Sequence, residues 1–191
     1  ITSDPSWWGG EPIWASVEKQ GKRAMTMFWP GSELAIGGVR PERWLPFDGK
    51  MSPDARADQV LAWFDLPVAR RPDFVTLYFD AVDHAGHDHG PDSVEVNDAI
   101  VATDRAIGRL LDGLKRRGLL DRTNIIVVSD HGQIATEKGA YVILDDIVDV
   151  RDLDIQNQGL LATFAAKPGR EAAVEKTLLA PHEHVRCWKR E

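Results

Sequence analysis

Two apolar stretches with a long helical pattern between them constrain the fold more than any other part of the sequence. The first stretch, residues 73–79, has the sequence DFVTLYF, and the second, residues 124–129, has the sequence NIIVVS. Both are rich in β-branched or aromatic residues, and the second is apolar on both faces, which favours a central strand of a parallel sheet. Between them, residues 92–117 carry apolar side chains at helical spacing, and Gly118 follows. This order of strand, helix and strand predicts an α/β fold.

The rest of the chain continues the alternation of strands and helices. We expect further helices at 11–20, 53–64 and 171–179, and further strands at 24–29, 141–144, 160–165 and 184–188. The pattern predicts a mostly parallel central sheet with helices on both faces, and 191 residues fit a single α/β domain over residues 1–191. Residues 31–53 are rich in glycine and proline, which predicts a long functional loop that forms part of a substrate pocket.

The charge and cysteine content argue against several classes of protein. The net charge is −7, and the longest basic run is Lys115-Arg116-Arg117. A surface that binds duplex nucleic acid needs a basic stripe, so we expect no such binding. The single cysteine, Cys187, excludes an intramolecular disulfide bond and a cysteine-rich zinc site. No apolar run reaches the roughly 18 residues of a membrane-spanning helix, and the sequence does not indicate an oligomeric state.

A cluster of acidic and histidine residues follows the first predicted strand. Residues 80–91, DAVDHAGHDHGP, hold three aspartates and three of the chain's six histidines. Asp83 and His87 are spaced so that both side chains face one point in a turn of helix or a tight loop, and Gly86 permits a close approach there. A carboxylate with an imidazole suits zinc, and less selectively manganese or iron. The alternative is a solvated acidic loop whose histidines cap nearby carbonyl groups.

A second pair, Asp130 and His131, directly follows the second predicted strand, and Gly132 lets the chain turn there. Ligands of α/β sheets bind beyond the carboxyl ends of the strands, where both pairs are predicted to lie. We therefore predict that the pairs bind metal ions, which would give an acidic protein local positive charge for an anionic substrate. Two ligands per ion are too few, since a catalytic zinc ion has three protein ligands and an open position. The alternative is that Asp130 caps a helix and His131 is packed.

The other histidines are weaker candidates for metal ligands. His84 and His89 flank the first pair, and we expect them to form hydrogen bonds around the ligands. His182 and His184 precede a predicted edge strand, and we expect them on the surface.

Four motifs together resemble the nucleotide pyrophosphatase/phosphodiesterase family of the alkaline phosphatase superfamily. They are WWGGEPIW, FWPGSE, LYFDAVDHAGHDHGP and NIIVVSDHG, which occur in the family's order along nearly the whole chain. The motif SDHG alone would also be shared with related phosphatases and mutases. The resemblance implies an alkaline phosphatase-like fold, of which this chain would be the central part of a larger catalytic domain.

The resemblance implies a centre of two zinc ions. Asp83 and His87 match the ligands of one ion, and Asp130 and His131 match two ligands of the other. In the family, a Thr or Ser nucleophile and a further Asp ligand precede the WWGG motif, and a final His ligand lies in a later segment. None of these has a counterpart in the sequence, so we expect the nucleophile upstream, no catalytic nucleophile within residues 1–191, and no activity from this piece alone.

The resemblance also assigns residues to the substrate pocket. Phe47 matches an aromatic platform for the nucleobase, and the alternative is that it anchors the loop. Tyr78 matches a tyrosine that lines the phosphate pocket, although an alternating strand residue can equally belong to the core. Trp29, Ser32 and Glu33 are expected to shape the same pocket.

The resulting hypothesis is zinc-dependent hydrolysis of nucleotide phosphodiester or pyrophosphate bonds, with release of a nucleoside monophosphate. The metal ions would activate the nucleophile and stabilise the leaving oxygen, so that a covalent phospho-enzyme forms and is hydrolysed. The family implies a periplasmic or secreted protein. One alternative is another phosphoesterase of the superfamily that acts on phosphomonoesters, phosphonates or lipid phosphodiesters, and another is a non-catalytic fragment that binds metal or nucleotide.

Overall fold

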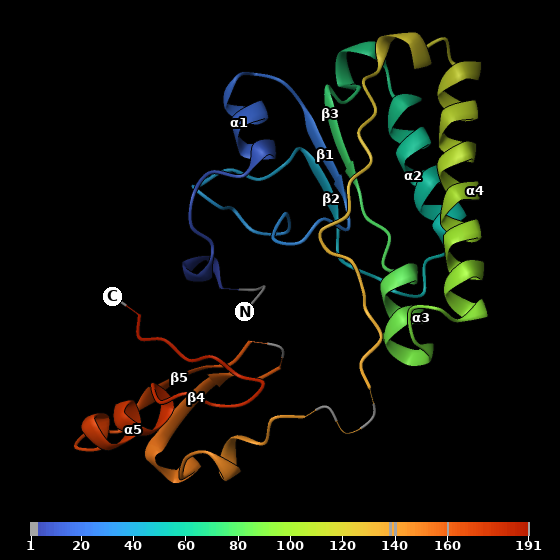
Figure 1. Ribbon diagram of the computed structural model, residues 1–191. Coiled ribbons are helices and arrows are strands. Elements are labelled where there is room, and N and C mark those ends of the chain that lie inside the picture. Colours follow the sequence, from blue (N-terminus) through green and yellow to red (C-terminus); the bar gives the residue numbers. More distant parts are fainter. Residues whose placement is uncertain (1–3, 138, 140, 160, 191) are drawn as a thin grey trace. The chain divides into compact units, whose positions relative to one another are not determined.

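The computed structural model describes residues 4–137, 139, 141–159 and 161–190 (Figure 1). It divides into two compact units, Ile1–Ala135 and Thr136–Glu191. Alternation of strands and helices predicts the class of a fold, but it does not predict how many hydrophobic cores these elements form. The single domain over 1–191 therefore stays a prediction.

The first unit contains a parallel sheet of three strands in the order β2-β1-β3. The strands are β1 (Ala24–Met27), β2 (Arg43–Leu45) and β3 (Phe74–Leu77). Met25 pairs with Arg43 on one side and with Val75 on the other. All four residues of β1 are buried because this strand is central. The predicted strands at 24–29 and 73–79 are confirmed, and β2 lies within the predicted loop at 31–53.

Helices cover both faces of this sheet, α1 on one and α2 and α4 on the other (Figure 1). The helices of this unit are α1 (Ile13–Lys19), α2 (Pro53–Phe64), α3 (Ala81–His89) and α4 (Val94–Arg116), with short 3-10 helices at Pro5–Trp7, Val68–Arg70 and Leu120–Arg122. Successive strand residues point to opposite faces. Accordingly, Ala24 packs with Trp14 of α1, whereas Met25 packs with Val60 and Trp63 of α2. The α/β class with a parallel sheet and helices on both faces is confirmed.

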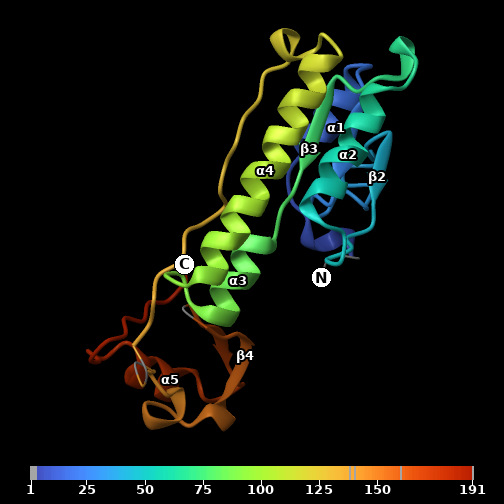
Figure 2. The same cartoon turned by 90° about the vertical axis from the view of Figure 1, so that its right-hand side faces the viewer.

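α2 and α4 pack closely against each other on the same face of the sheet (Figure 2). Each helix begins at a serine N-cap, since Ser52 accepts from the backbone N–H of Ala55 and Ser93 from that of Val96. Three exposed ion pairs join the helices: Asp54–Arg105, Asp58–Arg109 and Asp65–Arg117. Gly113 is buried in α4, where a Cβ atom would lie 2.4 Å from Cδ1 of Leu61 in α2.

Substituting Gly113→Ala should lower the free energy of unfolding by about 1–3 kcal/mol, because the added methyl group overpacks the contact with Leu61. Gly108→Ala on the same helix is the matched control, since its added Cβ has no neighbour within 4 Å beyond the adjoining residues and backbone of its own helix. This control should be neutral or stabilising by up to about 1 kcal/mol, the helix preference of Ala over Gly. Denaturant unfolding of both variants measures the difference, and equal effects would contradict the close helix contact.

The described part of the second unit has a two-stranded antiparallel sheet and one α-helix. Its elements are β4 (Leu153–Asn157), β5 (Thr163–Ala166) and α5 (Glu171–Leu178), with 3-10 helices at Leu144–Asp146 and Val150–Asp152. Val148, Leu153, Val174 and Leu178 form its buried core. The predicted helix at 171–179 is confirmed, and β5 overlaps the predicted strand at 160–165, of which Leu160 lies outside the described residues.

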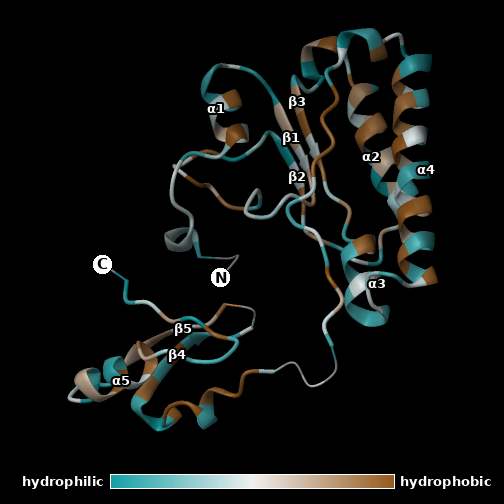
Figure 3. Ribbon diagram, viewed as in Figure 1, coloured by the Kyte–Doolittle hydropathy of each residue, from teal (hydrophilic) through white to brown (hydrophobic). Residues whose placement is uncertain are grey.

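Three of the predicted strands are wrong. Residues 124–129 pair with no strand in the described part of the chain, and Ile126 is 82% exposed. Figure 3 shows this hydrophobic stretch as an irregular trace outside the sheet. An apolar run becomes a strand only when a neighbouring strand satisfies its backbone hydrogen bonds, which the sequence pattern does not reveal. Residues 141–144 and 184–188 likewise form no strand.

Among the described residues, no helix has the length and apolar character needed to cross a membrane.

Candidate functional site

α3 places the first predicted pair on one helix face, directly beyond the carboxyl end of β3. Nε2 of His87 lies 3.5 Å from Oδ1 of Asp83, one turn earlier in the helix. Within the polar sequence of residues 80–91, Ala81–His89 form a helix rather than a solvated loop, and the spacing of four residues brings the two side chains together.

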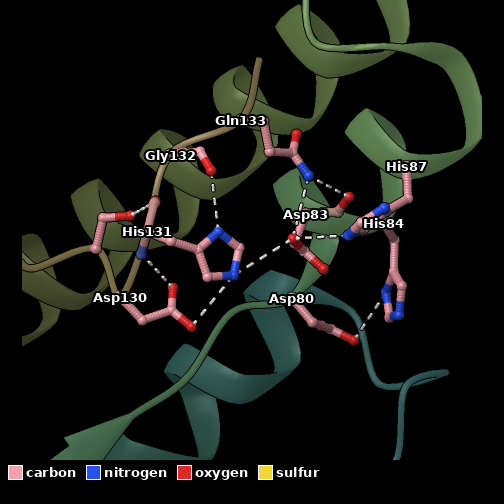
Figure 4. Close-up of polar contacts among 9 residues, drawn as sticks. Asp80, Asp83, His84, His87, Asp130, His131, Gly132 and Gln133 are labelled. Atoms are coloured by element: carbon pink, nitrogen blue, oxygen red, sulfur yellow. Dashed lines mark hydrogen bonds and ion pairs between the residues drawn. The ribbon is translucent and has the colours of Figure 1, made fainter. Parts of the chain in front are cut away.

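The second pair lies beside the first, in the segment that follows α4 (Figure 4). Nε2 of His131 lies 3.8 Å from Oδ1 of Asp83 and 3.6 Å from Oδ2 of Asp130. The backbone N–H of His131 donates to Oδ1 of Asp130 at 3.1 Å, and the Ser129 hydroxyl donates to the carbonyl oxygen of His131. The four predicted metal-binding residues thus converge, with the Asp83 carboxylate between the two histidines.

Gln133 connects the two segments and was missed by the sequence analysis. Its Nε2 donates to both the carbonyl oxygen and Oδ1 of Asp83, at 3.1 Å in each case. The close approach depends on Gly86, because a Cβ there would lie 1.6 Å from Oε1 of Gln133. Gly86 and Gln133 do not belong to any sequence motif that links them, so the sequence alone does not reveal this contact.

A buried ion pair lies beneath the site. Nη1 of Arg56 in α2 is 2.7 Å from Oδ1 of Asp80, and both side chains are buried. Oδ2 of Asp80 is 3.2 Å from Nδ1 of His84, which brings His84 into contact with a carboxylate near the predicted ligands. Neither Arg56 nor Asp80 was predicted as a site residue, although a lone arginine among the apolar positions of 53–64 can indicate a buried partner.

The pKa of the Tyr78 hydroxyl is raised, first by burial and then by the negative charges of Asp80, Asp130 and Asp83. The hydroxyl therefore stays protonated at neutral pH and can donate a hydrogen bond. Its ring centre is 6.4 Å from that of Phe47. Phe47 itself is 56% exposed, so part of its ring is open to solvent beside the converging polar residues.

The remaining predicted pocket residues lie between β1 and β2. Ser32 is buried, and its hydroxyl accepts from Thr26 at 2.8 Å and donates to the carbonyl oxygen of Trp29 at 2.7 Å. Trp29 packs against the core that contains Trp14, and Glu33 is half-buried. These contacts support the loop fold, and substrate contact by Trp29, Ser32 and Glu33 stays a prediction.

The other histidines form no hydrogen bond or ion pair with the converging pairs in the described part of the chain. His89 is an exposed residue at the end of α3. In the second unit, Nε2 of His182 is 2.9 Å from the carbonyl oxygen of Thr177, and His184 is exposed beside Glu183.

The donor atoms at the site match the chemistry of zinc in part. Two ligand atoms on a tetrahedral zinc ion, each bound at about 2.0–2.1 Å, lie about 3.4 Å apart. The contacts of Asp83 with His87 and of His131 with Asp130, at 3.5 and 3.6 Å, are close to that separation. No group of three or more such side chains in the described part of the chain is arranged to hold one ion. The residues present therefore fit zinc as two pairs of ligands, and each pair needs a further ligand to complete its site.

Comparison with solved structures defines the fold class more closely. Murine ectonucleotide pyrophosphatase / phosphodiesterase 5, solved as an inactive variant in complex with AMP, matches with a TM-score of 0.84 at 29% identity over 92% of this chain and 46% of that chain. The human protein of the same name matches with a TM-score of 0.83 at 26% identity, over 94% of this chain and 48% of that chain. The fold is alkaline phosphatase-like.

The chain belongs to the type I phosphodiesterase / nucleotide pyrophosphatase family, whose family model matches residues 1–191. A venom phosphodiesterase of Naja atra is 45% identical over 192 residues, which cover 96% of this chain and 23% of the relative. Ectonucleotide pyrophosphatase/phosphodiesterase family member 3 of Bos taurus is 41% identical over 133 residues, or 70% of this chain and 15% of the relative. The chain thus spans less than a quarter of the length of these relatives.

Proposed function

We propose that the protein containing this chain hydrolyses nucleotide phosphodiester or pyrophosphate bonds and releases a nucleoside monophosphate. The observation that carries the proposal is the convergence of Asp83 and His87 with Asp130 and His131 at the carboxyl end of β3. The names of the relatives, which are phosphodiesterases and nucleotide pyrophosphatases, support it. AMP in the complex with the murine protein supports a nucleotide as substrate.

The proposal includes two zinc ions, one held by Asp83 and His87 and the other by Asp130 and His131, each with ligands from outside this chain. Zinc at these positions would supply Lewis acid stabilisation of charge on the phosphoryl oxygens. The nucleophile, a Thr or Ser that forms a covalent phospho-enzyme, is expected upstream. A periplasmic or secreted location is part of the same proposal, supported by the venom relatives.

The chain's own residues would bind and orient the substrate. Gln133 holds the Asp83 carboxylate by its hydrogen bond to Oδ1, which fixes the direction of the remaining lone pairs. The protonated Tyr78 hydroxyl can donate to a phosphate oxygen. Phe47 would stack on the nucleobase, and the phosphate would then lie near the acidic and histidine residues.

Phe47→Ala should reduce kcat/KM for a nitrophenyl ester of a nucleoside monophosphate by roughly 5- to 100-fold, because base stacking on an aromatic side chain contributes about 1–3 kcal/mol. Hydrolysis of bis(nitrophenyl) phosphate, which has no nucleobase, should fall much less. The measurement compares both substrates with the full-length protein and its variant. Equal losses on the two would argue against base recognition by Phe47.

The overall proposal is tested by metal analysis and hydrolysis assays on the complete polypeptide. We expect two equivalents of zinc and faster hydrolysis of nucleotide diesters than of phosphomonoesters, phosphonates or lipid diesters. A preference for one of those other substrates would support another phosphoesterase activity. Tight metal or nucleotide binding without any hydrolysis would support a non-catalytic protein.

A further inference from the structure

The buried side chain of Arg56 joins three segments that surround the candidate site. Arg56 lies on α2 and is 2% exposed. Its Nε donates to the carbonyl oxygen of Met51 at 2.9 Å, and its Nη1 donates to that of Tyr78 at 3.0 Å. The same Nη1 lies 2.7 Å from Oδ1 of Asp80. One guanidinium thereby holds together α2, the end of the pocket loop and the connection between β3 and α3.

The guanidinium also lies over two aromatic rings. Cζ of Arg56 is 5.0 Å from the ring centre of Phe28 and 5.8 Å from that of Phe47. The rings of Phe28 and Phe47 meet edge to face, with their centres 5.4 Å apart. Phe47 is thus supported from the protein side by a cation and an aromatic edge, while more than half of its surface remains exposed.

Phe28 has a strained backbone at this place. Its φ is 59°, in the left-handed region that a bulky side chain rarely adopts, yet the residue is only 5% exposed. It directly follows β1, and this conformation holds its ring against Arg56 and Phe47. Such strain persists only where the surrounding contacts fix the residue.

The contacts of Arg56 continue to the helix that carries the predicted metal ligands. Oδ2 of Asp80, the atom not facing Arg56, lies 3.2 Å from Nδ1 of His84, the residue after Asp83. Asp80 is 6% exposed, so its carboxylate depends on the Arg56 guanidinium for compensation of its charge. Arg56 therefore restrains the first turn of α3 on one side and the ring of Phe47 on the other.

We propose that Arg56 is a positioning residue that sets the distance between the Phe47 ring and the first turn of α3, and thereby determines selectivity for nucleotides over diesters without a base. The proposal rests on the proposed function. A lysine could retain the charge opposite Asp80, but it lacks the planar fork that bonds Met51, Tyr78 and Asp80 while facing two rings.

The test uses Arg56→Lys in the full-length protein. The selectivity ratio is kcat/KM for a nitrophenyl ester of a nucleoside monophosphate divided by kcat/KM for bis(nitrophenyl) phosphate. We expect this ratio to fall about tenfold, because the variant should lose part of the free energy that base stacking contributes. The loss should appear mainly as a higher KM for the nucleotide ester. Arg109→Lys is the matched control, since Arg109 pairs with Asp58 on the exposed side of α2, and it should leave the ratio unchanged.

A second variant covers the case in which the single substitution disturbs folding. Arg56→Met combined with Asp80→Asn removes both charges together and leaves no buried charge without a partner. Circular dichroism checks its fold, and the same loss of selectivity is expected. A selectivity ratio equal to that of the wild type in either folded variant would overturn the proposal.

A double-mutant cycle separates positioning from a general structural effect. If Arg56 acts through Phe47, Arg56→Lys should not change the ratio further once Phe47→Ala is present. An equal fall in the presence and absence of Phe47 would overturn the proposal. Failure of the proposed function would be distinguishable from failure of the role of Arg56, because the wild-type protein would then hydrolyse no nucleotide ester.

Discussion

Substitution of Asp83 by Asn is expected to lower the hydrolysis of a nucleotide ester by the full-length protein roughly a thousandfold or more. Oδ1 of Asp83 lies within 4 Å of Nε2 of both His87 and His131, so this one carboxylate contacts each predicted pair. A bound metal ion contributes several kcal/mol to catalysis, and each 1.4 kcal/mol corresponds to about a factor of ten in rate. Loss of the carboxylate charge should also reduce the zinc content of the purified protein.

Asp88→Asn is the matched control, because Asp88 is an exposed carboxylate on the same helix. It removes the same charge from α3 and should leave both zinc content and kcat/KM close to those of the wild type. Elemental analysis and steady-state kinetics measure the two effects in parallel. Similar activity and zinc content in the Asp83 and Asp88 variants would exclude a metal-binding role for Asp83.

Gly86→Ala should reduce kcat/KM for the nucleotide ester about 10- to 100-fold, the usual effect of losing a hydrogen bond that orients a metal ligand. An added Cβ would lie 1.6 Å from Oε1 of Gln133 and must displace that amide from Asp83. Steady-state kinetics and zinc affinity of the full-length protein measure the loss.

Gln133→Ala should cause a similar loss, since it removes the same hydrogen bond without adding a methyl group. The double variant should be no worse than either single one, because both act through one contact. Gly108→Ala, at an open glycine of α4, serves as the control and should not change activity. Full additivity of the Gly86 and Gln133 substitutions would show that Gly86 has some other role.

The sequence predicted the elements whose signals are local. The helices at 53–64 and 92–117 were identified from apolar side chains at helical spacing, with Gly118 after the second, and the structure has them at Pro53–Phe64 and Val94–Arg116. The strand at 73–79 was likewise marked by its β-branched residues. The prediction at 124–129 failed because an apolar run needs a neighbouring strand, and in the described part of the chain it has none.

The candidate site was predictable to a similar extent. Asp83 with His87, and Asp130 with His131, stand out because each pair is close in sequence. The rule for ligand sites in α/β sheets correctly predicted the place of the first pair beyond β3, whereas the second pair meets it without the strand that the rule assumed. Gln133 and Arg56 were missed because their partners, Asp83 and Asp80, are distant in the sequence. A single glutamine carries no pattern that indicates a distant partner, and a lone arginine among apolar positions indicates a buried partner without identifying it.

The three ion pairs between α2 and α4 have a consequence for the alignment of these helices. Asp54 and Asp58 are four residues apart, as are Arg105 and Arg109, so a slip of one helical turn would still pair one aspartate with one arginine. The third pair breaks this repeat, because seven residues separate Asp58 from Asp65 whereas eight separate Arg109 from Arg117. Although each exposed pair is worth little alone, only one mutual position of the helices forms all three, and a slip of one turn would form only one such pair, so the three pairs together select against a shifted packing.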